Sequence, residues 1–160
     1  MHDNNAKNLP DHAGVFVPPP LLYVIFFVIG MLLQRVWPVG LLSSLLGRAV
    51  ASACLTAGIG LGIWSVLTFR RAKTNVLPIR PSTAIVTDGP FRFTRNPMYL
   101  SLSLLYMGTA FWLDMLWPVL LLPVLLFLVQ TYIIAREERY LERKFGGEYL
   151  QYRSRVRRWI

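Results

Sequence analysis

Two long runs of apolar residues constrain this chain more than any other feature of its sequence. The run 49–69 contains no charged residue, and the run 21–37 contains one, Arg35, close to its end. The hydrocarbon core of a bilayer is roughly 30 Å thick, and a helix of about 20 apolar residues crosses it. Both runs therefore predict transmembrane helices, because a fold in water could not cover so much apolar surface.

Two further apolar stretches follow in the second half of the chain. The stretch 98–112 would rise only roughly 22 Å as a helix and barely spans a bilayer. The stretch 115–135 is long enough, but Pro118 and Pro123 are expected to kink it near its start. Residues 111–114 predict a turn that joins the two stretches. We therefore expect an all-α integral membrane protein with about four transmembrane helices, the last two a hairpin; a single buried hairpin beside two full spans is the alternative.

Basic residues give the chain a formal net charge of +9, and they gather in two segments between and after the apolar runs. By the positive-inside rule, both segments, both termini and the active site face the cytoplasm, and we expect a bacterial inner membrane. Anionic membrane lipids are the expected partners of these charges. Nucleic acid is not, since the aromatic residues concentrate in the apolar runs.

We expect one membrane-embedded domain over the whole chain. Its single cysteine, Cys54, lies inside an apolar run, so the sequence predicts neither a disulfide nor a metal site. The expected parts are a polar N-terminus (1–18), two transmembrane helices (19–69), a cytoplasmic loop (70–97), a helical hairpin (98–135) and a basic C-terminal segment (136–160).

A first polar motif precedes the third apolar stretch and reads Thr-Arg-Asn-Pro-Met-Tyr over residues 94–99. Asn96 and Pro97 are typical of the N-cap and first position of a helix. A helix start leaves amide donors free, so it could bind a carboxylate together with Arg95. The alternative interpretation is a basic turn that caps a helix and contacts lipid phosphates.

A second motif directly continues the fourth apolar stretch. Glu137 and Glu138 would lie at a depth where a carboxylate is costly unless it meets a cation. One interpretation is that these carboxylates bind a functional partner. The other is an interfacial pair whose charge Arg136 and Arg139 neutralise.

Apolar and aromatic residues recur at helical spacing after this pair. They predict an amphipathic helix at the membrane surface, provided that Gly146 and Gly147 do not break it. The residues are Leu141, Phe145, Tyr149 and Tyr152.

Three glycines in the second run, Gly58, Gly60 and Gly62, form a ridge of small residues. Such a ridge favours close packing of helices in lipid, and a cofactor lying on this face is the less favoured interpretation.

The two motifs, in this order around a helical hairpin, resemble the isoprenylcysteine carboxyl methyltransferase family, including its bacterial members, and more loosely the phospholipid N-methyltransferases. The resemblance covers residues 77–156. It rests on the Gly89-Pro90-Phe91-Arg92 turn, the Arg95-Asn96-Pro97-Met98-Tyr99 box, the Glu137-Glu138 pair and the pattern from Phe145 to Tyr152. Asn96 stands where the eukaryotic carboxyl methyltransferases usually have His, and this resembles the phospholipid enzymes.

The resemblance implies methyl transfer from S-adenosylmethionine, with S-adenosylhomocysteine as product, in a membrane-embedded site without a Rossmann fold. No glycine-rich dinucleotide fingerprint occurs in the sequence, in agreement with this expectation. The residues expected to bind the cofactor are Arg95, Asn96, Pro97, Tyr99, Glu137 and Glu138. Arg92 and Arg153 could attract an acidic substrate head, and no catalytic residue is assigned, because the reaction mainly needs positioning.

The expected substrate is a lipid or another hydrophobic small molecule, such as a carboxylate of a prenylcysteine-like compound. A phospholipid amine and a small hydrophobic thiol are alternatives. From another class, a non-catalytic membrane assembly or partner-binding protein remains a competing interpretation.

Overall fold

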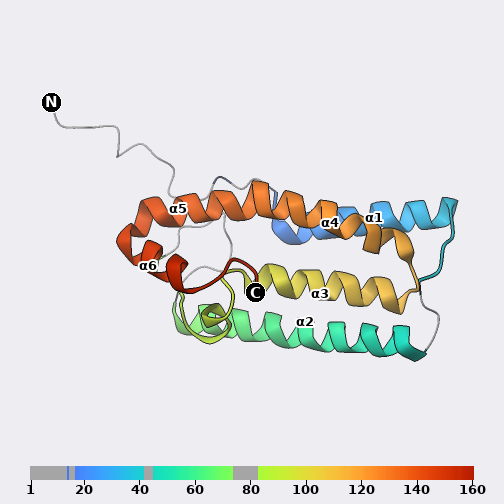
Figure 1. Cartoon of the computed structure of the whole chain (residues 1–160), viewed down its shortest axis with the longest axis horizontal. Coiled ribbons are helices and arrows are strands. Elements are labelled where there is room, and N and C mark those ends of the chain that lie inside the picture. Colours follow the sequence, from blue (N-terminus) through green and yellow to red (C-terminus); the bar gives the residue numbers. More distant parts are fainter. Residues whose placement is uncertain (1–13, 15–16, 42–44, 74–82) are drawn as a thin grey trace.

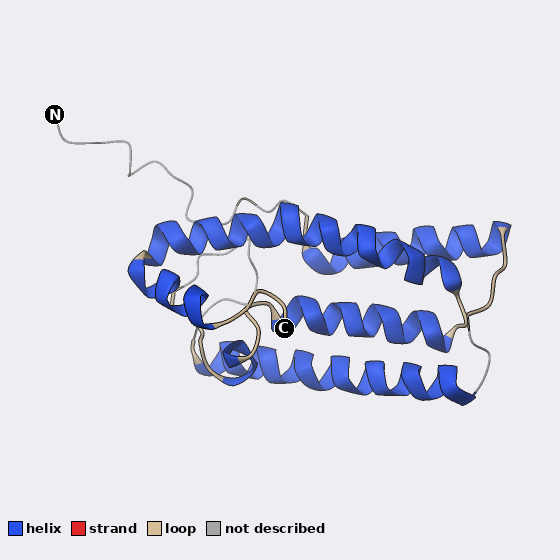
Figure 2. Ribbon diagram, in the orientation of Figure 1, coloured by secondary structure: helices blue, strands red, loops and turns tan. Residues whose placement is uncertain are grey.

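The chain folds into helices joined by short connections, as the computed structural model shows for residues 14, 17–41, 45–73 and 83–160 (Figure 2). No strand occurs within these ranges, and the all-α class without a Rossmann fold is confirmed. The stretch 73–87, whose length would allow a lid over the cofactor, falls mostly outside the described residues. The elements are α1 (Pro19–Val36), α2 (Leu45–Arg71), the 3-10 helix η2 (Gly89–Arg92), α3 (Pro97–Trp112), α4 (Leu116–Leu128), the π-helix η3 (Val129–Ile134), α5 (Ala135–Phe145) and α6 (Gly147–Arg155).

Four long helices run side by side along one axis of the molecule (Figure 1). α1 packs along α4, α2 packs along α3, and α3 also contacts α1 and α4. Within the described residues, three helices are long and apolar enough to cross a membrane: α1, α2 and the continuous helix Leu116–Phe145. α3 has 16 residues and is shorter than a full span, as its sequence predicts.

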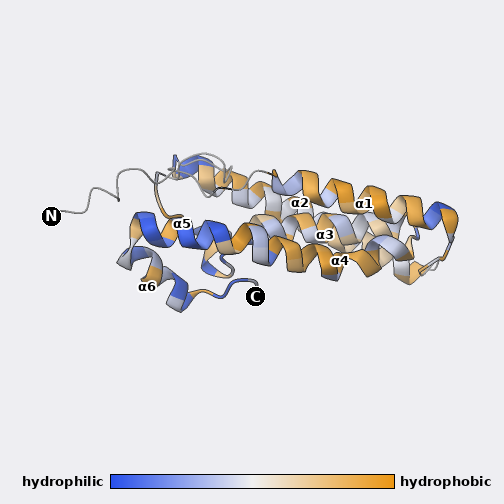
Figure 3. Ribbon diagram, turned by 90° about the horizontal axis from the view of Figure 1, so that it is seen from above, coloured by the Kyte–Doolittle hydropathy of each residue, from blue (hydrophilic) through white to orange (hydrophobic). Residues whose placement is uncertain are grey.

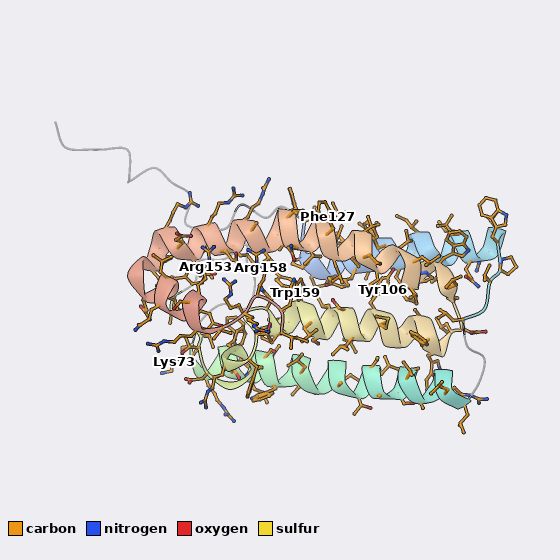
Figure 4. All side chains as sticks on the ribbon, viewed as in Figure 1. Lys73, Tyr106, Phe127, Arg153, Arg158 and Trp159 are labelled. Carbon is orange, nitrogen blue, oxygen red and sulfur yellow. The ribbon has the colours of Figure 1, made fainter. Side chains whose placement is uncertain are left out.

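The outer faces of these helices are apolar, which suits contact with lipid tails. Val24 and Leu32 of α1, Ile63 of α2 and Phe127 of α4 are each more than half exposed. Figure 4 shows Phe127 pointing away from the other helices. The most hydrophilic residues gather instead at the end that carries α5 and α6 (Figure 3). The molecule therefore has an apolar body and one polar end, as a membrane protein requires.

Close contact between α2 and α3 depends on two of the three glycines in the ridge. A Cβ atom at Gly58 would lie 3.0 Å from the Leu105 side chain, and one at Gly62 would lie 2.7 Å from the Ser101 Oγ atom. Gly60 has nothing within 4 Å. The close-packing interpretation is confirmed for Gly58 and Gly62, whereas Gly60 lies on another face of the helix.

The fourth apolar stretch does not end where the polar segment begins. α4, η3 and α5 form one continuous helix from Leu116 to Phe145, which passes through Pro118 and Pro123 and carries the π turn in its middle. The expected division near residue 135 therefore marks a change of composition and not a helix end, and Glu137 and Glu138 continue the helix as expected. Charged residues continue the helix because their backbone hydrogen bonds are the same, and only their surroundings change.

The expected amphipathic helix is broken after Phe145. Gly146 has φ 53° and ψ −124°, a conformation that only glycine adopts readily, and it separates α5 from α6. α6 turns back beside α5 toward the body of the molecule (Figure 1). The break brings Tyr149 and Tyr152 to the polar end of the helices instead of extending them along the membrane surface.

Candidate cofactor and substrate cavity

A cavity of about 180 Å³ lies at the polar end of the molecule, between the start of α1, the end of α2, η2, the start of α3, α5 and α6. One water needs only roughly 15 Å³, so the cavity has room for a ligand much larger than a water. Its walls include every residue that the sequence predicts for cofactor binding: Arg95, Asn96, Pro97, Tyr99, Glu137 and Glu138. Residues about 40 positions apart in the sequence are thus brought to one site.

Glu138 is buried, with 7 % of its surface exposed, and two arginines neutralise it. Arg95 Nη1 lies 2.9 Å from Glu138 Oε1. Arg158 donates from Nε to Oε1 at 3.1 Å and from Nη2 to Oε2 at 2.5 Å. The hydrogen bonds to Glu138 raise the pKa of Arg158, so this guanidinium stays charged. A carboxylate is stable at this depth because two cations surround it.

The expected pairing of this carboxylate with Arg136 or Arg139 is not seen. Arg136 donates to the Gly14 carbonyl at 2.8 Å and stacks on the ring of Tyr132, and Arg139 is exposed. Both side chains follow the helical twist away from the cavity, whereas Arg95 and Arg158 come from other segments.

The segment 156–160 folds back onto the motif that precedes α3. The backbone N–H of Arg95 donates to the Arg157 carbonyl at 2.9 Å. The side-chain Nδ2 of Asn96 donates to the Arg158 carbonyl, also at 2.9 Å. Thr94 Oγ1 donates to the same Arg158 carbonyl at 3.1 Å. Asn96 thus occupies the N-cap position of α3, but its side chain holds this segment instead of capping the helix.

Glu137 faces the start of α3. Tyr99 donates its hydroxyl to Glu137 Oε1 at 2.6 Å, and Tyr23 of α1 donates to the Tyr99 backbone carbonyl at 3.3 Å. The π turn η3 directly precedes this part of the helix. Such turns change which side chains share a face and are frequent at functional sites.

Tyr149 and Tyr152 of α6 brace the turn that carries η2. Tyr152 donates its hydroxyl to the Phe91 carbonyl at 2.8 Å, and Arg95 Nη1 lies 3.5 Å from the Tyr149 hydroxyl. Burial raises the pKa of Tyr152, so this hydroxyl keeps its proton and remains a donor. The break at Gly146 therefore contributes to the site, because it directs both tyrosines onto Phe91 and Arg95.

Most of the other residues that line the cavity are apolar. They come from the first turn of α1, the end of α2 and the facing sides of α3 and α5. They include Pro19, Phe69, Val86, Met98, Leu102 and Leu141. A ligand with a charged head and an apolar part would match both kinds of residue.

Arg92 and Arg153 lie outside the cavity walls. Arg92 is exposed, and Arg153 forms an exposed ion pair with Glu142 at 3.2 Å. The expectation that they attract a substrate head stays a prediction. Among the described residues, no group of three or more His, Cys, Asp or Glu side chains could hold a metal ion.

Sequence reasoning did not find Arg158, the second partner of Glu138. Its only distinguishing feature in the sequence is the tryptophan that follows it in a basic segment. Trp159 donates to Gln130 Oε1 of η3 at 2.9 Å and packs on the core.

Comparison with known proteins identifies the family. The family model for phospholipid methyltransferase matches residues 46–148, well over half of the chain. The chain belongs to this family. The expected resemblance to the isoprenylcysteine carboxyl methyltransferase-like enzymes is thereby confirmed, and the matched region runs from α2 into α6.

A protein of Haemophilus influenzae described as uncharacterized is similar to part of the chain. It is 43% identical over 63 residues, which are 39% of this chain and 100% of that protein. No solved structure matches. Family membership and the three candidate spans together indicate a membrane methyltransferase.

Proposed function

We propose that this protein transfers a methyl group from S-adenosylmethionine to a membrane-soluble substrate in the cavity at its polar end. The observation that carries the proposal is the convergence of both motifs on one cavity with both charged and apolar walls. The family supports methyl transfer, and the geometry supports a site for a zwitterionic cofactor beside a hydrophobic acceptor.

The charged residues of the cavity fit the amino acid part of this cofactor. Arg95 Nε is buried and has no hydrogen-bond partner among the described residues, so it is a donor in need of an acceptor. A cofactor carboxylate would supply that acceptor. Glu137 would bind the ammonium group, since Tyr99 holds its carboxylate in place through Oε1.

When bound, S-adenosylmethionine supplies an activated methyl group on a sulfonium. The residues of this chain then have three tasks: to bind both reactants, to align them in line and to exclude water. Tyr99 and Leu102 also line the cavity, and they would help to hold the acceptor beside the cofactor. No covalent intermediate with the protein is needed.

The acceptor would reach the cavity from the bilayer, because the apolar walls come from the ends of membrane helices. A lipid carboxylate is ionised at neutral pH and needs no base, whereas an amine must first lose a proton. A carboxylate acceptor therefore predicts a rate that stays flat above neutral pH, and a phospholipid amine predicts one that rises with pH. We place the site on the cytoplasmic side of the membrane, as the basic segments favour.

Transfer of labelled methyl groups in proteoliposomes tests the proposal. The protein is reconstituted in bacterial lipids with methyl-labelled S-adenosylmethionine, and the lipid phase is extracted and counted. We expect label in that phase with the native protein and with Glu142→Gln, whose carboxylate lies in an exposed pair. Glu137→Gln is expected to abolish most of it. Absence of transfer to carboxylate, amine and thiol acceptors alike would overturn the proposal and favour a partner-binding role.

A further inference from the structure

Two guanidinium groups compete for one buried carboxylate at the wall of the cavity. Arg158 contacts both oxygens of Glu138, while Arg95 contacts Oε1 through Nη1 alone. A guanidinium normally pairs with a carboxylate through two parallel hydrogen bonds. Arg95 is prevented from doing so because Arg158 already occupies the bidentate position.

The consequence is visible in the hydrogen bonds of Arg95. Its Nε atom is buried without a partner among the described residues, and its side chain is 11% exposed at the cavity wall. A buried charged donor of this kind is costly unless something accepts from it. The arrangement thus leaves one donor of Arg95 without an acceptor, which a bound anion at the cavity wall would supply.

Arg158 is held in place by contacts that do not use its own guanidinium. Its backbone carbonyl accepts from Asn96 Nδ2 and Thr94 Oγ1, and the neighbouring Trp159 donates to Gln130. Figure 4 shows Arg158 and Trp159 in the space between α5 and α3. A change of the Arg158 side chain should therefore leave the segment 156–160 docked.

We propose that Arg158 is a positioning residue of the cofactor site, which takes up Glu138 bidentately so that Arg95 can bind the carboxylate of the ligand. This inference rests on the proposed function and extends it beyond the residues 46–148 that match the family. Without Arg158, Arg95 becomes the main cation for Glu138, turns its planar fork onto both oxygens and withdraws Nε from the ligand.

Two ligands that differ in the amino acid part separate this role from a merely structural one. S-adenosylhomocysteine carries the carboxylate, whereas 5′-methylthioadenosine keeps the nucleoside and thioether and lacks it. Binding of both is measured on the full chain in lipid nanodiscs, with Arg158→Gln and with Arg155→Gln as control. Arg155 is an exposed arginine at the end of α6, so its replacement makes the same charge change away from the cavity.

We expect Arg158→Gln to weaken S-adenosylhomocysteine by about tenfold to a hundredfold, the worth of a charge-assisted hydrogen bond. Binding of 5′-methylthioadenosine should not change, and Arg155→Gln should bind both ligands like the native chain. Arg158→Lys keeps the charge but cannot form the bidentate pair, so it too should weaken S-adenosylhomocysteine and leave 5′-methylthioadenosine unchanged. This second variant tests the inference even if Arg158→Gln folds poorly.

Three results would overturn the inference. If both Arg158 variants bound S-adenosylhomocysteine and 5′-methylthioadenosine with the native affinities, Arg95 would not depend on Arg158. Equal weakening of the two ligands would assign Arg158 a general structural role. Failure of the native protein to bind either ligand would instead contradict the proposed function itself, and the inference with it.

Discussion

Two adjacent carboxylates at the end of a membrane helix determine how this end of the molecule is built. Glu138 is stabilised by Arg95 and Arg158, and Glu137 by the hydroxyl of Tyr99. These partners come from two other segments, so the pair ties α5 to the start of α3 and to the segment 156–160. The same contacts that make these carboxylates tolerable also form the charged wall of the cavity.

Tyr99→Phe is expected to weaken both stability and cofactor binding. It removes the 2.6 Å hydrogen bond to Glu137 and leaves a carboxylate oxygen without its donor, which costs about 1–3 kcal/mol. Thermal unfolding in detergent and binding of S-adenosylhomocysteine measure the two effects. Tyr132→Phe is the control, because the ring of Tyr132 is 37% exposed and contacts Arg136 through its face. Unchanged stability and binding in Tyr99→Phe would contradict this role of Tyr99.

The sequence predicts the residues of the site better than their pairing. Local motifs identify Arg95, Asn96, Glu137 and Glu138, because each breaks an otherwise apolar or purely basic pattern. The partner Arg158 could not be predicted, since it is one of several similar arginines in a basic segment. Only the return of that segment over residues 94–96 distinguishes it, and this contact is made in three dimensions.

Among the elements, the break between α5 and α6 is expected to be sensitive to substitution. Gly146→Ala places a Cβ atom at φ 53°, which is expected to destabilise the protein by about 1–2 kcal/mol and to displace α6. Gly147→Ala is the matched control. Gly147 is the first residue of α6, its φ is not positive, and nothing lies within 4 Å of its Cβ position. Unfolding by denaturant compares them. Equal stability of the two variants would show that the positive φ is not needed.

The contact between α2 and α3 gives a second comparison of neighbouring glycines. Gly58→Leu would force its side chain against Leu105 of α3, where a Cβ atom alone already lies at 3.0 Å, and should cost about 1–3 kcal/mol. Gly60→Leu has open space around it and should be tolerated. Thermal stability in detergent measures the difference. If Gly60→Leu were as destabilising as Gly58→Leu, the packing of α2 against α3 would be different from that described.

Helix existence is predictable from the sequence, but helix ends are not. The apolar runs coincide closely with α1, α2, α3 and the first two thirds of the helix Leu116–Phe145. Hydropathy changes at residue 136, whereas the backbone hydrogen bonding that defines the helix does not. The sequence left open whether Gly146 and Gly147 end the helix, because a glycine in a helical pattern is compatible with either outcome.

At the scale of the whole molecule, an apolar body and one charged end explain the location of the cavity. The C-terminal ends of α2 and α5 carry basic residues, and they lie at the same end of the molecule as the start of α3 (Figures 1 and 3). In the proposed function, this location would let a water-soluble cofactor and a lipid-soluble acceptor reach one site from two phases.

Orientation in the membrane can be tested by cysteine labelling. With Cys54 replaced by Ser, Arg155→Cys at the charged end should react with an impermeant maleimide only in inside-out vesicles. Val39→Cys in the connection at the opposite end, 41% exposed, should react only in right-side-out vesicles. The reverse pattern would place the cavity on the outer face and contradict the positive-inside prediction.

Calorimetric binding of S-adenosylhomocysteine to the protein in lipid nanodiscs tests the central claim most directly. The native protein and Glu142→Gln are expected to show saturable binding, and folded Glu138→Gln is expected to lose most of it, because Arg95 and Arg158 no longer share a charged partner. No binding to the folded native protein, or native affinity in Glu138→Gln, would contradict the assignment of this cavity as the cofactor site.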